Sequence, residues 1–303
     1  MKQVYTLEDL LSRELLDADC NKLARLAVIG HPVAHSASPQ MHQAALDAAE
    51  IRMRYIRLDI EPGQVADAFR KMRALGFIGC NVTVPHKLEA MAACDEVHPE
   101  AKLLGAVNTI RFDENAICGF NTDGPGFSHA IADDFKKQLG SLKIGIVGAG
   151  GGAGGAIAMQ SAIDGANQLL LVNRSLEKLA PLVQRLMAVN QDLKITTLAF
   201  DDPALAEYCL GCDLIVNTSS VGLKAEDPSV LPPECLKSTH LIYDTIYQPA
   251  VTPLLDIADH RGCHTANGLS MLIHQGALAF QHWFPESAPL PIMQAAMSHF
   301  ARS

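Results

Sequence analysis

The chain has 303 residues, of which 49% are hydrophobic, so it is long enough to bury two sizeable cores. Its 24 basic and 33 acidic residues give a formal net charge of -9, which argues against nucleic acid or an anionic membrane as a partner. No export signal opens the sequence and its eight cysteines are scattered, so we expect reduced thiols in a cytoplasmic protein.

Short β-rich runs alternate with helical patterns along the chain, which is typical of α/β architecture with parallel sheets. Residues 1–25 form an acidic amphipathic extension, for which a helix and a loose arm are both open. One series of βα units precedes residue 123 and a second begins near residue 142, so we expect two sheets and then a helical tail. The expected strands are 25–30, 54–60, 77–84, 106–112, 143–147, 168–172, 194–200, 212–218 and 240–247, and the expected helices include 39–50, 62–76, 268–285 and 291–303.

The first expected strand leads into a turn that combines two prolines and three histidines with Ser36 and Ser38. Two hydroxyls in so rigid a turn are unusual at the end of a buried strand, and composition alone gives them no role. Four histidines are candidate acid–base groups, although polar loop or surface histidines are the commoner case: His31, His35, His42 and His86.

Lys87 follows a β-rich run and Pro85, which suits a first helical turn, so we expect the lysine in that turn. A cation there faces the positive end of the helix dipole, which is unusual for a structural lysine and suits a proton-transfer group. A solvated lysine at a helix start is the alternative. Asp123 is in the same way either a helix cap or a carboxylate that holds the ammonium while a proton passes to a substrate oxygen.

The second series opens with a strand, a glycine-rich loop and a helix of small residues. Gly148, Gly150 and Gly151 would let the backbone turn and approach a pyrophosphate at the helix N-terminus. A merely flexible turn is the alternative, but the strand before the loop and the helix after it favour dinucleotide binding.

The next strand ends in Asn173 and Arg174, without the acidic residue that an NAD site usually places there. Arg174 offers a planar cation to a 2′-phosphate and Lys178 follows one turn later, so NADP is favoured over an exposed arginine without a role. Cys209 and Cys212 lack a second pair, so we expect incidental thiols and no metal.

Seven motifs follow one another from about Leu26 to the C-terminus: "HSASP", "NVTVPHK", "GAVNT", "NTDG", "GAGGGAGG", "NRS" and "MLIHQGALAF". In this combination and order, the chain resembles the shikimate dehydrogenase family. The resemblance implies reversible, NADP-dependent reduction of 3-dehydroshikimate to shikimate, in the pathway to aromatic amino-acid precursors.

The resemblance also implies a division into domains. An α/β substrate-binding catalytic domain with a mostly parallel sheet would comprise residues 26–123 and 266–303. A Rossmann-like NADP-binding domain would comprise residues 124–265, and residues 1–25 would remain an extension. The C-terminal helices would pack back on the first domain, and the substrate would lie between the two domains.

Roles follow residue by residue from the same resemblance. Lys87 and Asp123 would be the catalytic pair. The substrate would be bound by Ser36, Ser38, Asn81, Thr83, Asn108, Tyr247 and Gln275, with both serines and Tyr247 at its carboxylate. The cofactor would be bound by Gly148, Ala149, Gly150, Gly151, Gly152, Asn173, Arg174, Ser175, Lys178 and Gly268.

The chain departs from the family at several of these positions. Lys178 replaces the family's second phosphate-contacting arginine, Gly152 stands where alanine is usual, and Asn267 replaces the aspartate before Gly268. The related alternatives are a quinate or amino-shikimate dehydrogenase that uses NAD or NADP. A catalytically silent ligand sensor is disfavoured because Lys87 and Asp123 are both retained. We expect a monomer or homodimer with a small-molecule substrate.

Overall fold

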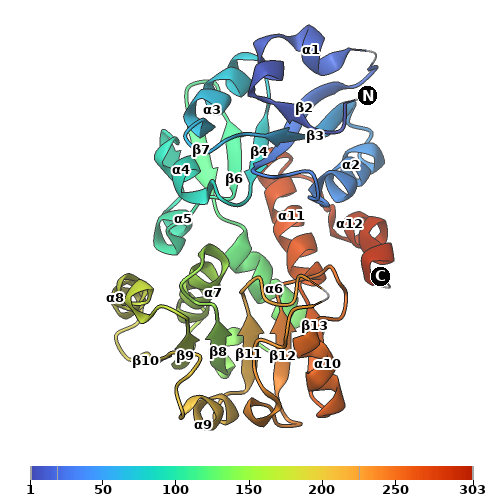
Figure 1. Ribbon diagram of the computed structural model, residues 1–303. Coiled ribbons are helices and arrows are strands. Elements are labelled where there is room, and N and C mark those ends of the chain that lie inside the picture. Colours follow the sequence, from blue (N-terminus) through green and yellow to red (C-terminus); the bar gives the residue numbers. More distant parts are fainter. Residues whose placement is uncertain (1, 19, 225, 302–303) are drawn as a thin grey trace. The chain divides into compact units, whose positions relative to one another are not determined.

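The computed structural model describes residues 2–18, 20–224 and 226–301 and has the expected α/β architecture (Figure 1). The chain forms two compact units, unit 1 from Met1–Thr122 with Gln275–Met297 and unit 2 from Asp123–His274 with Ser298–Ser303. The division differs from the one we expected, because Asp123, residues 266–274 and Ser298–Ser303 belong to unit 2, and the N-terminal extension belongs to unit 1.

Unit 1 contains a seven-stranded sheet in its described residues, in the order β1-β3-β2-β4-β6-β7-β5. The pairs β1–β3, β3–β2, β2–β4 and β5–β7 are parallel, while β6 is antiparallel to both of its neighbours. The mostly parallel sheet is therefore confirmed. The strands are β1 (Tyr5–Thr6), β2 (Leu23–Gly30), β3 (Met53–Asp59), β4 (Gly79–Val82), β5 (Glu96–Val97), β6 (Thr109–Phe112) and β7 (Ile117–Phe120).

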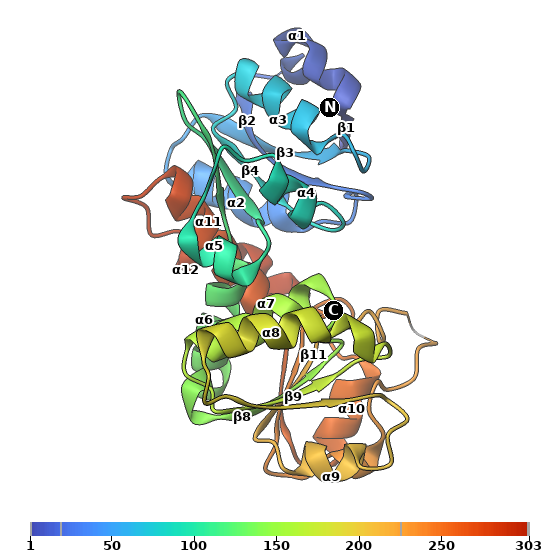
Figure 2. The ribbon, with the colours of Figure 1, turned by 90° about the vertical axis from the view of Figure 1, so that its left-hand side faces the viewer.

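Helices cover both faces of this sheet (Figures 1 and 2). One core contains apolar side chains of η1, α1, α3 and α4 packed on the strands, and α3 buries Val65, Phe69 and Met72 at helical spacing. α2 and α12 pack together in the same unit. The helices are η1 (Leu7–Leu11), α1 (Arg13–Asp17), α2 (Ser38–Ala48), α3 (Val65–Ala74), α4 (Lys87–Ala92), α5 (Pro99–Leu104), the part of α11 (Leu269–Trp283) from Gln275 onwards, and α12 (Leu290–Met297).

The N-terminal extension is an integral part of unit 1 in its described residues. β1 pairs with β3, and Leu10 and Leu16 are buried in the core. The short helices of this segment therefore cover one face of the sheet, which settles the choice between a helix and a loose arm.

Unit 2 contains a six-stranded sheet in its described residues, in the order β10-β9-β8-β11-β12-β13, and every pair in it is parallel. Counted along the unit, this is the order 3-2-1-4-5-6 of a dinucleotide-binding Rossmann sheet. The strands are β8 (Lys143–Val147), β9 (Gln168–Val172), β10 (Lys194–Leu198), β11 (Leu214–Asn217), β12 (Leu241–Asp244) and β13 (His264–Asn267).

The central strands of unit 2 are short apolar runs that are buried on both faces, as in β8 and β9. Neighbouring helices α6, α7 and α8 form a layer, and α9 and α10 contribute to a core that includes residues of β11 and β12. No described helix is long and apolar enough to cross a membrane. The helices are α6 (Asp123–Phe135), α7 (Gly152–Ile163), α8 (Ala180–Val189), α9 (Leu205–Leu210), α10 (Pro253–His260) and the first part of α11.

Candidate active site

The glycine-rich loop of unit 2 joins β8 to the N-terminus of α7. Gly148 has a φ of +85°, which L side chains rarely adopt, so the chain can turn sharply there. At Gly150, a Cβ would lie only 2.7 Å from Nδ2 of Asn173, so the loop packs directly against the end of β9. The backbone N–H groups of the first turn of a helix lack partners within that helix, which makes this a suitable place for a phosphate.

Asn173 connects this loop to the next one. Its Oδ1 accepts a hydrogen bond from the backbone N–H of Gly150 at 3.3 Å, and its Nδ2 donates to the carbonyl of Ser175 at 2.8 Å. The side chain of Asn173 therefore joins the glycine loop, through hydrogen bonds, to the segment that carries Arg174.

A cavity of about 630 Å³, within the size range of small-molecule sites, lies over this end of the unit 2 sheet. Arg174 and Lys178 supply positive charge to its lining, which includes no acidic residue among the residues that the structure describes. A 2′-phosphate would therefore meet cations without a competing carboxylate, so the residues fit NADP. The lining residues are Gly148, Gly150, Gly151, Asn173, Arg174, Ser175, Lys178, Phe200, Thr218, Ser219, Ser220, Val221, Pro228, Ser229 and Val230.

Several of these residues were missed by sequence reasoning. Phe200 follows β10, and Thr218 to Val221 follow β11, where loops at the carboxyl ends of parallel strands meet. The polar run "NTSS" directly after a buried strand was the available signal.

The space around Gly152 and around Gly268, which follows the departure at Asn267, shows whether a larger residue would fit at each glycine. A Cβ on Gly152 would have no neighbour within 4 Å, so the alanine usual in the family would fit and its loss leaves no cavity. A Cβ on Gly268 would lie 2.0 Å from the carbonyl oxygen of Thr245, so only glycine fits between β13 and α11. Gly268 does not line the cavity described above.

In unit 1, Asn108 is the centre of a buried polar network. Its Oδ1 accepts hydrogen bonds from the backbone N–H of Thr122 at 2.8 Å and from Oγ1 of Thr109 at 3.0 Å. Its Nδ2 donates to Oγ1 of Thr122 at 3.0 Å and to Oε1 of Gln275 at 3.5 Å. Asn108 and Gln275, 167 residues apart in the chain, are thus brought together.

Asn81 lies beneath this network, and both ends of its amide are used inside the sheet. Its Oδ1 accepts a hydrogen bond from the hydroxyl of Tyr55 at 2.7 Å, and its Nδ2 donates to Thr109 Oγ1 at 3.2 Å. Since its side chain is also buried, Asn81 supports the Asn108 segment from inside the sheet.

Lys87 is the first residue of α4, as the sequence predicted, and its side chain is half-buried. Thr83, also half-buried, follows β4 at the start of the same connection. Glu89 of α4 accepts hydrogen bonds from the backbone N–H groups of Gly63 and Val65, each at 3.0 Å. These bonds tie α4 to the start of α3 and hold the lysine's helix in place.

Ser36 and Ser38 lie at the turn that leads into α2, with Ser38 buried and Ser36 half-buried. The backbone N–H of Ser38 donates to Ser36 Oγ at 3.3 Å, so the two residues are close together. Arg57, a residue that sequence reasoning missed, donates two hydrogen bonds to the carbonyl of Ser36.

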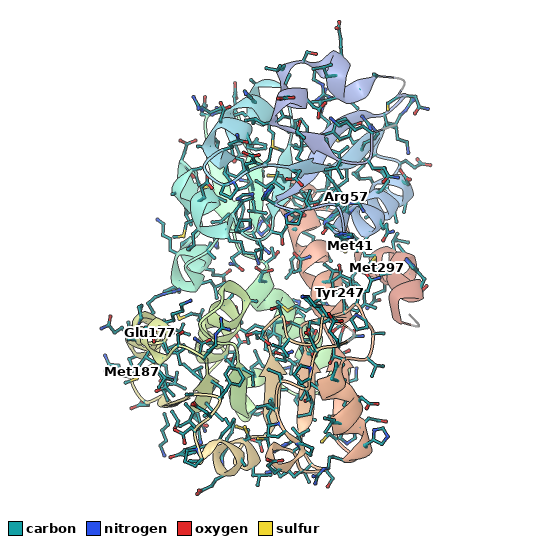
Figure 3. All side chains as sticks on the ribbon, in the orientation of Figure 1. Met41, Arg57, Glu177, Met187, Tyr247 and Met297 are labelled. Carbon is teal, nitrogen blue, oxygen red and sulfur yellow. The ribbon has the colours of Figure 1, made fainter. Side chains whose placement is uncertain are left out.

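The remaining predicted residues belong to unit 2. Asp123 is buried at the start of α6, directly after Thr122, and Tyr247 (labelled in Figure 3) lies in the segment after β12. Lys87 and Asp123 are therefore carried by different units, and their pairing stays a prediction.

Of the four candidate histidines, His42 and His86 are buried in the fold and the other two are exposed. His42 is fully buried and stacked on Tyr55 with ring centroids 4.5 Å apart, and burial lowers its pKa to about 3. His86 is also buried, with Nε2 2.6 Å from the carbonyl oxygen of Ile60. His31 is exposed beside Asp59, and His35 is exposed.

A Rossmann sheet with a basic cavity at its glycine loop, together with a second α/β unit in the same chain, is the arrangement of a dinucleotide-binding protein. A family model for the shikimate dehydrogenase substrate binding domain matches residues 28–110, and one for the shikimate 5′-dehydrogenase C-terminal domain matches residues 268–297. A protein of Methanopyrus kandleri named shikimate dehydrogenase (NADP(+)) is 35% identical over 289 residues, which cover 95% of this chain and 98% of that one. The chain belongs to the shikimate dehydrogenase family.

Solved structures agree with this assignment. The shikimate 5-dehydrogenase of Thermus thermophilus, in complex with NADP(H) and shikimate, has a TM-score of 0.77 and 34% identity, over 92% of this chain and all of that one. Quinate dehydrogenase of Corynebacterium glutamicum, in complex with NAD, has a TM-score of 0.81 and 27% identity, over 92% of this chain and all of that one.

Proposed function

We propose that this protein catalyses the reversible, NADP-dependent reduction of 3-dehydroshikimate to shikimate, a step toward aromatic amino-acid precursors. The observation that carries the proposal is the likeness, over almost the full length of both chains, to a protein named shikimate dehydrogenase (NADP(+)). The basic cavity beside the glycine loop supports NADP as the cofactor.

In this proposal the protein supplies binding, orientation and a proton, while bound NADPH supplies the hydride. Lys87 donates a proton to the substrate oxygen as negative charge develops there, and Asp123 holds the ammonium in position. The hydroxyls of Ser36 and Ser38 donate hydrogen bonds to the substrate carboxylate, with Tyr247 at the same end.

The amides of Asn108 and Gln275 would hold the ring hydroxyls together with Thr83, so that one ring carbon faces the cofactor. The hydrogen bond between the two amides supports a shared role. Asn81 acts indirectly in this scheme, because its amide is already engaged by Tyr55 and Thr109.

At the cofactor, Arg174 and Lys178 would contact the 2′-phosphate, and Asn173 and Ser175 would hold their segment in place. The glycine loop, from Gly148 through Ala149 and Gly150 to Gly151 and Gly152, would cradle the pyrophosphate. Gly268 would let the start of α11 pass close to the backbone at Thr245 and so complete the nicotinamide end.

A spectrophotometric panel tests the proposal. Shikimate and quinate are each offered with NADP⁺ and with NAD⁺ at matched concentrations, and formation of reduced nicotinamide is followed. We expect the highest kcat/KM for shikimate with NADP⁺. Absence of reduction with every pair would refute the proposal.

The second candidate is a quinate or amino-shikimate dehydrogenase, and the likeness to the NAD-bound quinate dehydrogenase favours keeping it. Quinate carries an additional hydroxyl at the carboxylate-bearing carbon, which needs room beside Ser36 and Ser38. A higher kcat/KM for quinate in the panel would replace the first proposal with this one.

We further propose that the protein acts in the cytoplasm as a monomer or homodimer. All eight cysteines, each in the described part of the chain, are unpaired, as a reducing compartment would keep them. Light scattering coupled to size-exclusion chromatography would distinguish the two oligomeric states.

A further inference from the structure

Arg57 of β3 holds the carbonyl group of Ser36 with two nitrogens of its guanidinium. Nη2 donates a hydrogen bond to that oxygen at 2.7 Å and Nε donates a second one at 3.1 Å. In the sheet, Arg57 is registered with Val28 of β2, the strand that leads into the serine turn. Two charged donors on one oxygen fix its position and direction more firmly than a single neutral bond would.

The other hydrogen bonds of Ser36 in the described chain are local to the turn. Its backbone N–H donates to the carbonyl of Val33 at 3.1 Å, and its hydroxyl accepts from the backbone N–H of Ser38. Arg57 is thus the residue through which hydrogen bonds attach Ser36 to the strands of the sheet.

The charge of Arg57 has no acidic partner among the described residues, because its hydrogen bonds are made to a backbone carbonyl. Arg54, three residues earlier on the same strand, is different. It is buried, donates to the carbonyls of Lys22 and Leu16, and pairs with Asp17 at 3.3 Å. Arg54 therefore stabilises the fold through its hydrogen bonds and its ion pair. The positive charge of Arg57 remains available to an anion near Ser36.

Arg57 lies outside the packed core, since its side chain is half-buried beside a cavity of about 250 Å³. A shorter or uncharged side chain there would leave space that water can fill. The fold can therefore tolerate a substitution at this position better than one in the core. The cavity is lined by Lys2, Gln3, Tyr5, Gln43, Arg54, Tyr55, Ile56 and Arg57.

We propose that Arg57 is a positioning residue for the substrate carboxylate. It acts through Ser36, whose turn it holds in the binding conformation, and its unpaired charge favours an anionic group at that end of the substrate. This inference rests on the proposed function, in which Ser36 and Ser38 bind the carboxylate.

The test uses the full-length enzyme and four variants, Arg57→Met, Arg57→Lys, Ser36→Ala and the double variant Arg57→Met/Ser36→Ala. Arg52→Met is the matched control, because Arg52 is exposed just before β3. For each protein we would measure kcat and KM for shikimate, KM for NADP⁺ and the thermal midpoint. Shikimate methyl ester, which lacks the negative charge, serves as a second substrate.

We expect Arg57→Met to raise KM for shikimate about 10-fold, with kcat and KM for NADP⁺ each changed less than about twofold. Arg57→Lys should recover part of the loss, because lysine keeps the charge without the paired donors. The methyl ester should be affected much less than shikimate. The double variant should be little worse than Ser36→Ala, since both changes remove the same interaction.

An unchanged KM for shikimate in Arg57→Met would overturn the inference. So would an equal rise in KM for shikimate and for its methyl ester, or effects of the two substitutions that are fully additive in the double variant. If the unmodified enzyme oxidises shikimate in the same assays, such a result leaves the proposed function intact. If the unmodified enzyme does not oxidise shikimate, the proposed function itself fails.

Discussion

Lys87 has the surroundings that a proton donor needs, because it begins a helix and its side chain is half-buried. We predict that Lys87→Met lowers kcat for shikimate oxidation about 10²- to 10⁴-fold, the usual contribution of a positioned acid or base. KM for shikimate should change little, since the serines and amides that bind the substrate remain. Steady-state kinetics at saturating NADP⁺ provide the measurement.

Lys102→Met is the control, because Lys102 is exposed on α5 of the same unit. Both variants should have circular dichroism spectra like that of the unmodified enzyme. A kcat for Lys87→Met within about twofold of the unmodified value would exclude a role in proton transfer.

Arg174 is the residue on which the preference for NADP depends most directly. It lines the cavity beside Lys178, and no acidic residue lines that cavity in the described part of the chain. Arg174→Asp should weaken NADPH binding at least about 10-fold more than NADH binding, because the new carboxylate repels the 2′-phosphate and can accept from a ribose hydroxyl. Isothermal titration with each cofactor measures the difference. Equal losses for the two cofactors would contradict this role, and exposed Arg261→Asp is the charge-matched control.

Single residues could be placed from the sequence where a neighbouring residue marks the start of an element. The position of Lys87 at a helix start could be predicted from Pro85 two residues earlier. The hydrogen bonds from Tyr55 to Asn81 and from Arg57 to Ser36 could not be predicted, because both depend on which strands become neighbours in the sheet.

Among the elements, the connection from β13 to α11 has a very tight backbone approach at Gly268. We predict that Gly268→Ala destabilises the protein by about 1–3 kcal/mol, because its Cβ would meet the rigid carbonyl of Thr245 and force the backbone to shift. Gly152→Ala is the matched control, since its Cβ would enter open space. Thermal and urea unfolding of both variants provide the comparison, and equal stabilities would show that the connection adjusts freely.

Long apolar strands could be predicted, and the strands that were missed include short or polar ones. β8 and β9 are continuous apolar runs, whereas β5 has two residues and β13 consists of His264, Thr265, Ala266 and Asn267. Strands of the second kind form because a neighbouring strand offers an edge to pair with, and no local pattern records that. The same reason explains why the pairing of β1 with β3 was not anticipated in the N-terminal extension.

Over the whole molecule, both units contain buried or half-buried histidines whose neutral form is favoured. Burial lowers the pKa of His42 to about 3 and that of His282 to about 4 in unit 1, and that of His240 to about 4 in unit 2. His282 is further disfavoured as a cation by nearby Arg111, and His240 by Lys237. The fold thus depends on deprotonated imidazoles in both of its units.

The lowered pKa values of these histidines determine in which direction stability changes with pH. A histidine whose pKa in the folded state lies below its ordinary value of 6.5 binds more protons when the protein is unfolded. Its contribution to stability is therefore fully present above about pH 6.5. The contribution is lost as the pH falls from there toward the folded-state pKa. We therefore predict that the free energy of unfolding decreases between about pH 6.5 and pH 4, by up to about 1.4 kcal/mol per pH unit for each such histidine.

His42→Phe isolates one of these contributions. Phenylalanine can keep the stacking on Tyr55, and neither ring nitrogen of His42 makes a hydrogen bond of ordinary geometry among the described residues. Urea unfolding at several pH values should show a slope of stability against pH that is shallower by about 1 kcal/mol per pH unit than in the unmodified protein. Burial raises the pKa of Asp134 and Asp244, which acts in the opposite direction, but that effect is common to both proteins and cancels in the difference. Exposed His264→Gln is the matched control, and a slope for His42→Phe identical to that of the unmodified protein would mean that His42 is not the group that titrates on unfolding.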